Sequence, residues 1–252
     1  MSDRGRVLVV TGGSRGIGAA VARRAAAEGW DVAVNYARDK AAADKVVAEV
    51  AAAGRRAAAI QGDMAIERDV VALFETAAAL LGRIGGVVNN AGVVGSPAGR
   101  LDQASADMIA RVVDLNVTGA LLVAREAARR LSTARGGAGG AIVNVSSIAA
   151  TLGAPGEYVW YAATKGAVDS MTVGLSRELA AEGVRVNAVS PGLIETDIHA
   201  SGGQPDRLKR LGPSVPIGRA GTAEEVAETV VWLLSDAASY VTGANVRVSG
   251  GR

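Results

Sequence analysis

Short runs rich in valine, isoleucine and alanine alternate along the chain with longer, alanine-rich stretches of amphipathic character. The short runs predict strands and the longer stretches predict helices. Seven strands are expected, at 6–10, 31–36, 56–61, 86–90, 141–147, 184–190 and 245–249. Helices are expected near 17–28, 40–53, 67–81, 105–133, 158–182 and 223–235.

This mostly alternating order of strands and helices predicts an α/β fold. We expect one doubly wound parallel sheet of about seven strands, with right-handed crossovers and helices on both faces. A chain of 252 residues fits a single domain of this kind, spanning 1–252. Residues 192–216 break the pattern, because glycine and proline recur there without sustained periodicity. We expect a mobile substrate loop at about 193–216 that closes as a lid.

The composition narrows the classes of protein and of partner. Aromatic residues make up only 3% of the chain, so alanine, valine and leucine must build the core, which suits helices packed on a parallel sheet. A net charge of +2, with both signs interspersed, argues against nucleic acid as a partner. The absence of cysteine excludes disulfides and thiolate metal sites, and no metal site is expected. With neither a signal-peptide core nor a membrane-spanning run, a cytoplasmic protein without a membrane partner is expected.

A glycine-rich turn joins the first strand to the first helix. Its sequence is TGGSRGIG, with glycines spaced as Gly12-x3-Gly16-x-Gly18. Glycines allow the backbone to approach a pyrophosphate closely, and the helix N-terminus offers unpaired N–H groups and a positive dipole end. The turn therefore indicates a phosphate-binding site, although its spacing differs from G-x-G-x-x-G.

Two other motifs overlap the same turn. Ser14 lies in a G-x-S-x-G pattern typical of serine hydrolases, but the only histidine is His199, and only one strand precedes Ser14. A serine hydrolase is the least favoured alternative. A phosphate loop of the Walker type is excluded, because two alanines follow Gly13-x4-Gly18 where lysine and serine or threonine are required.

A tyrosine and a lysine lie one helical turn apart in the expected helix 158–182. Tyr161 and Lys165 share one helix face, so both can approach the same ligand. A free tyrosine has a pKa near ~10, and a neighbouring cation lowers it towards the working range of a general acid or base. Ser146 and Ser147 end the preceding strand, where a hydroxyl could hold a substrate oxygen beside the tyrosine.

Together these motifs resemble the short-chain dehydrogenase/reductase family. The matching features are TGGSRGIG, Asp63, the stretch NNAG at 89–92, Asn116, Ser147, Tyr161-x3-Lys165 and the Pro-Gly pair at 191–192. They occur in the family's order and cover nearly the whole chain, most closely resembling 3-oxoacyl-[acyl-carrier-protein] reductases and glucose dehydrogenases. The resemblance implies a Rossmann-type fold and hydride transfer between nicotinamide and a carbonyl or alcohol, as in oxidoreductases acting on CH–OH groups.

The resemblance also implies catalytic roles. Ser147 would orient the carbonyl, Tyr161 would transfer the proton, and Lys165 would bind the nicotinamide ribose and lower the tyrosine pKa. Asn116 would belong to a proton-relay water chain, with a helix-to-helix hydrogen bond as the alternative. Ser147 precedes Tyr161 by fourteen positions, one more than is common in the family, and the extra residue falls within TLGAPGEYVW. Ser146 is the fallback, although strand alternation turns it to the opposite side.

A larger set of residues is expected to contact the cofactor. They lie in the glycine turn, at the ends of later strands and after 190: Gly12, Ser14, Arg15, Gly16, Ile17, Gly18, Asn35, Arg38, Asp63, Met64, Asn90, Ala91, Gly92, Tyr161, Lys165, Pro191, Gly192, Ile194 and Thr196.

The choice between NADP(H) and NAD(H) depends on the end of the second strand. An NAD-binding fold places an acid there, but Asn35 and Tyr36 are not acidic, and Asp39 is expected to cap the next helix. Arg38 and Arg15 could bind a 2′-phosphate instead. We therefore expect NADP(H), with NAD(H) as the weaker cofactor.

The substrate is constrained only broadly. Loops at 93–100, 152–160 and 193–216 should line its pocket, and most of their residues are small or apolar. A 3-oxoacyl thioester, a ketone or a sugar fits the resemblance, and an apolar or mixed carbonyl compound is favoured over a highly charged one. The resemblance further implies a homotetramer. A catalytically silent NADP-binding regulator is the other alternative, although it would have no need of the tyrosine hydroxyl.

Overall fold

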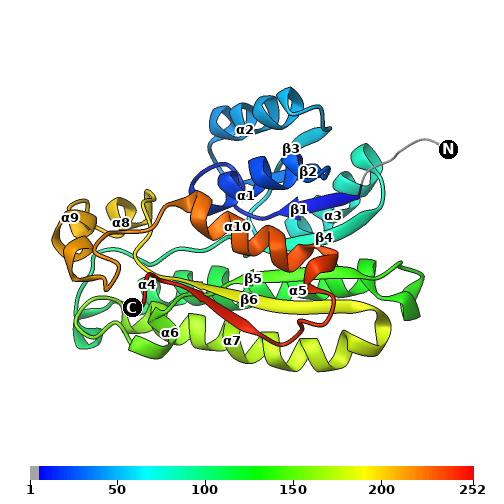
Figure 1. Cartoon of the computed structure of the whole chain (residues 1–252). Helices are drawn as coiled ribbons and strands as arrows, with labels where there is room; N and C mark the ends of the chain where they lie inside the picture. The colour runs from blue at the N-terminus through cyan, green and yellow to red at the C-terminus, as the bar shows by residue number, and fades with distance from the viewer. Residues whose placement is uncertain (1–5) are drawn as a thin grey trace.

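The computed structural model describes residues 6–252, and seven strands in this part of the chain form one parallel sheet (Figure 1). Their spatial order is β3-β2-β1-β4-β5-β6-β7. Because the order reverses between β1 and β4, the sheet is doubly wound, and the expected Rossmann-like fold is confirmed. The strands are β1 Val7–Val10, β2 Asp31–Tyr36, β3 Ala57–Gln61, β4 Ile84–Asn89, β5 Gly140–Val145, β6 Val184–Pro191 and β7 Asn245–Val248. The start of the N-terminal stretch considered above, residues 1–5, lies outside the described residues.

The central strands are buried on both faces, which explains their continuous apolar sequences. All residues of β1 and β2 are buried. Side chains alternate between the faces, so Leu8 and Val10 pack into one core cluster while Val7 and Val9 pack into the other. Both clusters are built almost entirely from alanine, valine, leucine and isoleucine, as the composition requires.

Helices cover both faces of the sheet (Figure 1). One layer contains α1 Gly16–Ala27, α2 Lys40–Ala52 and α10 Ala223–Leu234, and the other contains α3 Glu67–Leu81, α5 Ala120–Leu131 and α7 Val159–Leu179. Asp39 caps α2, where its carboxylate accepts a hydrogen bond from the Ala42 amide at 2.9 Å, as expected. Within residues 6–252, no helix has both the length and the apolar character needed to cross a membrane.

The segment expected as one helix at 105–133 is divided by a widened turn. Helix α4 covers Ala106–Val113, a π-helical turn covers Asp114–Gly119, and α5 follows directly. Two contacts account for the widening. The side chain of Asn116 hydrogen-bonds with the backbone of Val93, and Gly119 lies so close to the Met64 carbonyl that an added Cβ would be 2.6 Å from its oxygen. Neither contact can be read from helical periodicity.

The segment expected as an irregular loop contains two short helices. They are α8 Ile198–Ser201 and α9 Arg207–Leu211, and both lie at the same end of the molecule as the short helix α6 Ala149–Leu152 (Figure 1). Leu208 and Leu211 of α9 pack against a small buried cluster formed by Leu193, Val215 and Ala220. Tertiary packing therefore supports helices too short to be stable alone. The mobility of this segment remains a prediction.

Candidate active site

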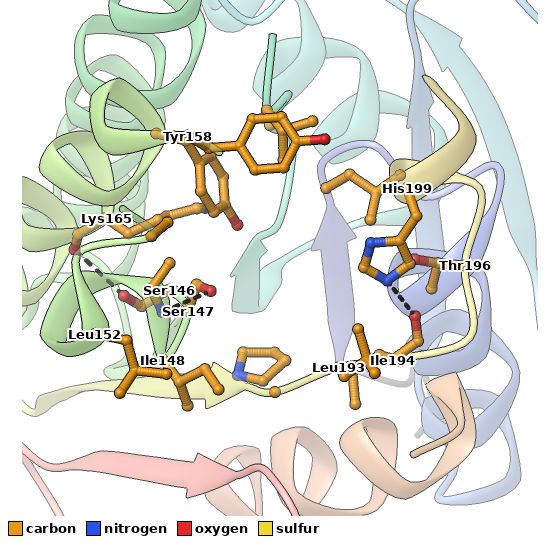
Figure 2. A pocket seen from close by; sticks show the side chains of 18 of the residues that line it. Ser146, Ser147, Ile148, Leu152, Tyr158, Lys165, Leu193, Ile194, Thr196 and His199 are labelled. Carbon is orange, nitrogen blue, oxygen red and sulfur yellow. Dashed lines mark hydrogen bonds between the residues drawn. The ribbon is translucent and has the colours of Figure 1, made fainter. Parts of the chain in front are cut away.

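One pocket at the carboxyl ends of the strands brings together residues from both halves of the chain. Its cavity volume is about 350 Å³. Figure 2 shows Tyr158, Lys165, Ser146, Ser147 and Ile148 on one side of the pocket and Leu193, Ile194, Thr196 and His199 on the other. Of the predicted site residues, those that line the pocket are Ile17, Asn90, Gly92, Ser147, Tyr161, Lys165, Pro191, Gly192, Ile194 and Thr196.

The glycine turn has the geometry of an anion site. Gly12 has a φ of +59°, and a Cβ added to Gly18 would lie 2.5 Å from the Gly12 carbonyl oxygen, so neither position accepts a side chain without strain. Helix α1 begins after Arg15 without a side-chain cap. Its first N–H groups can therefore bind a phosphate. Ser14 is half-buried beside them, and Thr196 lies across from Gly16.

Asn35 supports the glycine turn through hydrogen bonds of its side chain. Its Oδ1 accepts a hydrogen bond from the Gly12 amide at 3.1 Å, and its Nδ2 donates to the carbonyls of Gly62 at 3.0 Å and Ile60 at 3.3 Å. Asn35 thus links β2, β3 and the glycine turn, and its expected contact with a cofactor stays a prediction.

The next two predicted residues differ in exposure. Asp63 is exposed, and its Oδ1 accepts a hydrogen bond from the Ala65 amide at 3.0 Å. Met64 is 3% exposed, and its side chain packs into the core cluster that contains Phe74. The side chain of Met64 thus serves the core, and the expected contact of this residue with a cofactor stays a prediction.

The NNAG stretch is tied to the glycine turn by Thr11. The Thr11 hydroxyl oxygen accepts hydrogen bonds from the amides of Asn90 at 2.9 Å and Ala91 at 3.0 Å. The Asn90 side chain donates in turn to the carbonyls of Thr11 and Gly12, at 2.9 and 3.1 Å. These bonds give the NNAG stretch a structural role, and its contact with a cofactor stays a prediction. Thr11 was not predicted as a site residue, although it stands inside the motif.

Asn116 is buried and uses its side chain to join three segments. Its Oδ1 accepts from the Val93 amide at 2.9 Å, and its Nδ2 donates to the Val93 carbonyl at 2.8 Å and to the Thr164 hydroxyl on α7 at 3.1 Å. The helix-to-helix hydrogen bond considered as the alternative is therefore present. Both amide hydrogens are used, so a proton relay through this side chain has no free donor.

Ser147 and Tyr161 lie together on one side of the pocket. The Ser147 Oγ accepts a hydrogen bond from the Ala149 amide at 3.1 Å, which leaves its own hydrogen available for another oxygen. Burial raises the pKa of Tyr161, while a hydrogen bond with Ser147 and the positive charge of Arg207 lower it. Ser146 points differently, since its hydroxyl donates to the Lys165 carbonyl at 3.3 Å.

Lys165 is 5% exposed and directs its ammonium group to the end of β5. Its Nζ donates to the Val145 carbonyl at 2.7 Å and lies 5.6 Å from the centre of the Tyr161 ring. Burial lowers the pKa of Lys165 to about 8, and the charge of Asp169 partly opposes this effect. The charge of Arg207, which sequence reasoning did not identify, also lowers the pKa of Tyr161. The effect expected of Lys165 on this pKa stays a prediction.

The stretch after β6 forms the opposite wall. A Cβ on Gly192 would lie 2.8 Å from the Ser249 backbone, so the close passage of these two segments requires glycine here. The side chain of Ile194 is 5% exposed, and its carbonyl lies 2.9 Å from the Nε2 of His199. Ile194 and Thr196 both line the pocket, and their contacts with a cofactor stay a prediction.

Arg15 and Arg38 are exposed, and neither forms an ion pair with another residue of the described chain. Within residues 6–252 there is also no cluster of three or more histidine, aspartate or glutamate side chains arranged to hold a metal ion. Glu157, Tyr158, His199 and Arg207 also line the pocket. They lie in loops expected to line it, but no chemical role was predicted for their side chains.

Comparison with known proteins identifies the family. A family model described as enoyl-(acyl carrier protein) reductase matches residues 12–252. The oxidoreductase YgfF of Escherichia coli K12 is 50% identical over 246 residues, which cover 98% of this chain and 99% of YgfF. The chain belongs to the short-chain dehydrogenase/reductase family.

Solved structures of short-chain dehydrogenases/reductases agree with this assignment. A 3-ketoacyl-(acyl-carrier-protein) reductase of Brucella melitensis complexed with NADH has a TM-score of 0.90 and 34% identity, covering 100% of this chain and 99% of the other. A short-chain dehydrogenase of Burkholderia cenocepacia in complex with NADP has a TM-score of 0.88 and 36% identity, covering 98% and 97%. The chain is therefore a nicotinamide-dependent oxidoreductase that transfers hydride, and neither the silent regulator nor the serine hydrolase is supported.

Proposed function

We propose that this oxidoreductase uses NADP(H) to interconvert a compact, largely apolar carbonyl compound and its alcohol, with Tyr161 as the proton-transferring group. The observation that carries the proposal is the placement of the Ser147 and Tyr161 hydroxyls together in one pocket, with Lys165 buried beside them.

The residues present fit a dinucleotide. The glycine turn and the uncapped start of α1 would hold its phosphates, Asp63 is exposed near the end of β3 for the adenine, and Lys165, Ile194 and Thr196 would hold the nicotinamide end. When bound, the nicotinamide supplies or accepts the hydride at the substrate carbon.

The two hydroxyls would act on the substrate oxygen. The Ser147 hydroxyl, which bonds with Tyr161 in this structure, can donate its hydrogen to a substrate carbonyl oxygen instead, which polarises the carbonyl and fixes its position. Burial favours the protonated form of Tyr161 because it raises the pKa, so Tyr161 can donate its proton to the same oxygen during reduction. In the reverse direction Tyr161 must act as the phenolate, and positive charge around it then favours turnover.

The walls of the pocket indicate the kind of substrate. Around the two hydroxyls the lining is mainly apolar, with Val94, Ile148, Leu152, Leu193 and Ile198 among the residues. A cavity of about 350 Å³ is at the small end for ligand sites, and part of it must admit the nicotinamide. A compact, largely apolar ketone fits the apolar walls around the two hydroxyls better than a sugar, and the small volume disfavours a long acyl thioester.

The preference for NADP(H) rests on charge at the end of β2. No acid is present at Asn35 or Tyr36, Asp39 is engaged as a helix cap, and the exposed guanidinium groups of Arg15 and Arg38 carry no competing ion pair within residues 6–252. Both arginines are thus available to bind a 2′-phosphate through charge-assisted hydrogen bonds.

We further propose a single-domain cytoplasmic enzyme, spanning residues 1–252, that assembles as a homotetramer. Exposed apolar side chains support an interface on the helices expected to pair, with Val113 38%, Leu121 51% and Val173 41% exposed. Light scattering tests the tetramer, and cell fractionation tests the location.

The acid–base role is tested by Tyr161→Phe, which removes the hydroxyl and keeps the ring. Turnover with NADPH against a panel of ketones should fall by about 10²-fold or more, while cofactor binding persists. Tyr240→Phe is the matched control, because Tyr240 is fully exposed and remote from the pocket lining. Turnover of Tyr161→Phe close to that of the wild type would refute the proposed role. Hydrolysis of p-nitrophenyl esters, measured in parallel, should stay at background.

A further inference from the structure

Two segments on opposite sides of the pocket are joined directly. The Tyr158 hydroxyl, just before α7, donates to the Gly202 carbonyl at 3.0 Å and accepts from the Gln204 side chain at 3.1 Å. Its neighbour Glu157 accepts a hydrogen bond from Arg207 of α9 at 2.5 Å. The 193–216 segment is therefore held against the loop that precedes the Tyr161 helix.

Arg207 is fixed from three directions. Besides its bond to Glu157, its guanidinium lies 5.6 Å from the centre of the Tyr158 ring, and its Nη1 lies 3.4 Å from the Nδ1 of His199. The His199 Nε2 faces the Ile194 carbonyl, which only accepts, so Nε2 carries the hydrogen and Nδ1 can accept from Arg207. Burial lowers the pKa of His199, which keeps the ring neutral and suited to this contact.

We propose that Arg207 is a positioning residue of the active site, which the 193–216 segment carries to the pocket so that its positive charge faces Tyr161. The proposal rests on the acid–base role proposed for Tyr161. Arg207 lines the same cavity as Tyr161, its side chain is only 16% exposed, and Glu157, Tyr158 and His199 hold it in place.

The charges around Tyr161 explain why this cation matters. Lys165, on the same helix, donates to the Val145 carbonyl and has its ammonium group 5.6 Å from the centre of the Tyr161 ring, and Arg252 also lines the pocket. Ser147 and His199 are neutral. Glu157 is paired with Arg207 and compensates only part of its charge. The charge of Arg207 lowers the pKa of Tyr161, so it adds to these cations in favouring the phenolate needed to oxidise an alcohol.

This arrangement depends on the loop between Ser147 and Tyr161. Glu157 and Tyr158 lie in this loop, where Ala154 adopts a φ of +45°. The loop thus supplies anchors for Arg207. Closure of the 193–216 segment would then both cover the substrate and complete the charge environment of Tyr161.

The test is the pH dependence of kcat/KM for alcohol oxidation in Arg207→Met, Arg207→Lys and Lys209→Met. Oxidation requires deprotonated Tyr161, so rates fall on the acid side of its pKa. Arg207→Met should shift the fall in kcat/KM on the acid side to higher pH. At these acidic pH values kcat/KM should be roughly three- to tenfold lower than in the wild type, and at alkaline pH it should return to the wild-type value. Arg207→Lys, which keeps the charge, should stay near the wild type. Lys209→Met removes one exposed charge from the same helix and should leave the profile unchanged.

A loss of equal size at every pH in Arg207→Met, or an Arg207→Lys profile as displaced as that of Arg207→Met, would overturn the inference in favour of a structural role. If Arg207→Met does not fold, Glu157→Gln decides the question. This variant keeps the arginine and removes its countercharge, so the fall in kcat/KM on the acid side should shift to lower pH. An unchanged pH profile, or a shift to higher pH, would overturn the inference. Activity of Tyr161→Phe close to that of the wild type would instead refute the proposed function. If Tyr161→Phe is inactive but the pH profile of Arg207→Met is unchanged, only the role of Arg207 is refuted.

Discussion

The buried ammonium group of Lys165 should make the stability of the cofactor-free protein depend on pH in an unusual direction. Lys165 is 5% exposed, and its pKa falls from 10.5 to about 8 on folding. Each pKa unit corresponds to about 1.4 kcal/mol, so keeping this charge buried disfavours folding by about 3 kcal/mol at most. The perturbation that isolates this effect is Lys165→Met, which fills the same space without a titrating group.

The sign follows from where the proton is bound. Below pH 8 both states carry the charged lysine, and the penalty of burying it is fully present. Between about 8 and 10.5 the unfolded chain binds more proton than the folded one, so stability rises with pH. Above 10.5 the amine is neutral in both states and the penalty is gone.

Chemical denaturation without cofactor, at pH values on both sides of this window, provides the assay. The free energy of unfolding of the wild type should rise relative to Lys165→Met by up to about 3 kcal/mol between the two ends of the window. Because the other titrating groups are common to both proteins, they cancel in the difference. Lys209→Met is the control and should show a flat difference, since Lys209 is exposed. A constant or shrinking difference for Lys165→Met would refute the reasoning.

Three other predictions address the cofactor site and the lid. The double variant Arg15→Ala plus Arg38→Ala should erase most of the preference for NADP(H) in kcat/KM, at roughly 1–3 kcal/mol per lost charged hydrogen bond, and a wild-type ratio would show that neither arginine binds the phosphate. Asn35→Ala leaves the Gly12 amide unpaired, so calorimetry should show weaker binding of both cofactors alike and a lower Tm; a selective loss for one cofactor contradicts this. Hydrogen exchange in 193–216 should slow when cofactor and substrate are added, and equal protection in both states would indicate a rigid wall.

Local patterns in the sequence predicted the layers of the fold well. All seven strands appear, because runs such as RVLVV combine β-branched residues with burial on both faces. The strand boundaries in the structure differ from the expected ones where the residue types show little preference for a strand. Strand β4 begins at Ile84, ahead of two glycines, and β5 ends at Val145 because the following serines turn towards α7 and the pocket.

The site was predictable where its residues are close in the chain and obscure where they are distant. Tyr161 and Lys165 are one turn apart, so helix geometry alone placed them together. The partnership of Arg207 with Glu157 spans fifty positions and depends on loop conformation, which no periodicity encodes. For Asn35 the sequence suggested a ligand contact. Only the three-dimensional structure shows that its side-chain amide forms hydrogen bonds within the protein.

The widened turn at Asp114–Gly119 implies a trade-off between thermal stability and activity. A π-helical turn accommodates one more residue than an α-helical turn, so a chain shortened by one position here could close into an unbroken helix with better backbone geometry. Such a shortened chain would lose the hydrogen bonds of Asn116 with Val93 and Thr164. It would also lose the packing of the Asn116 side chain against Gly92. Selection for heat resistance alone would therefore be expected to remove this turn, whereas selection for turnover should keep it.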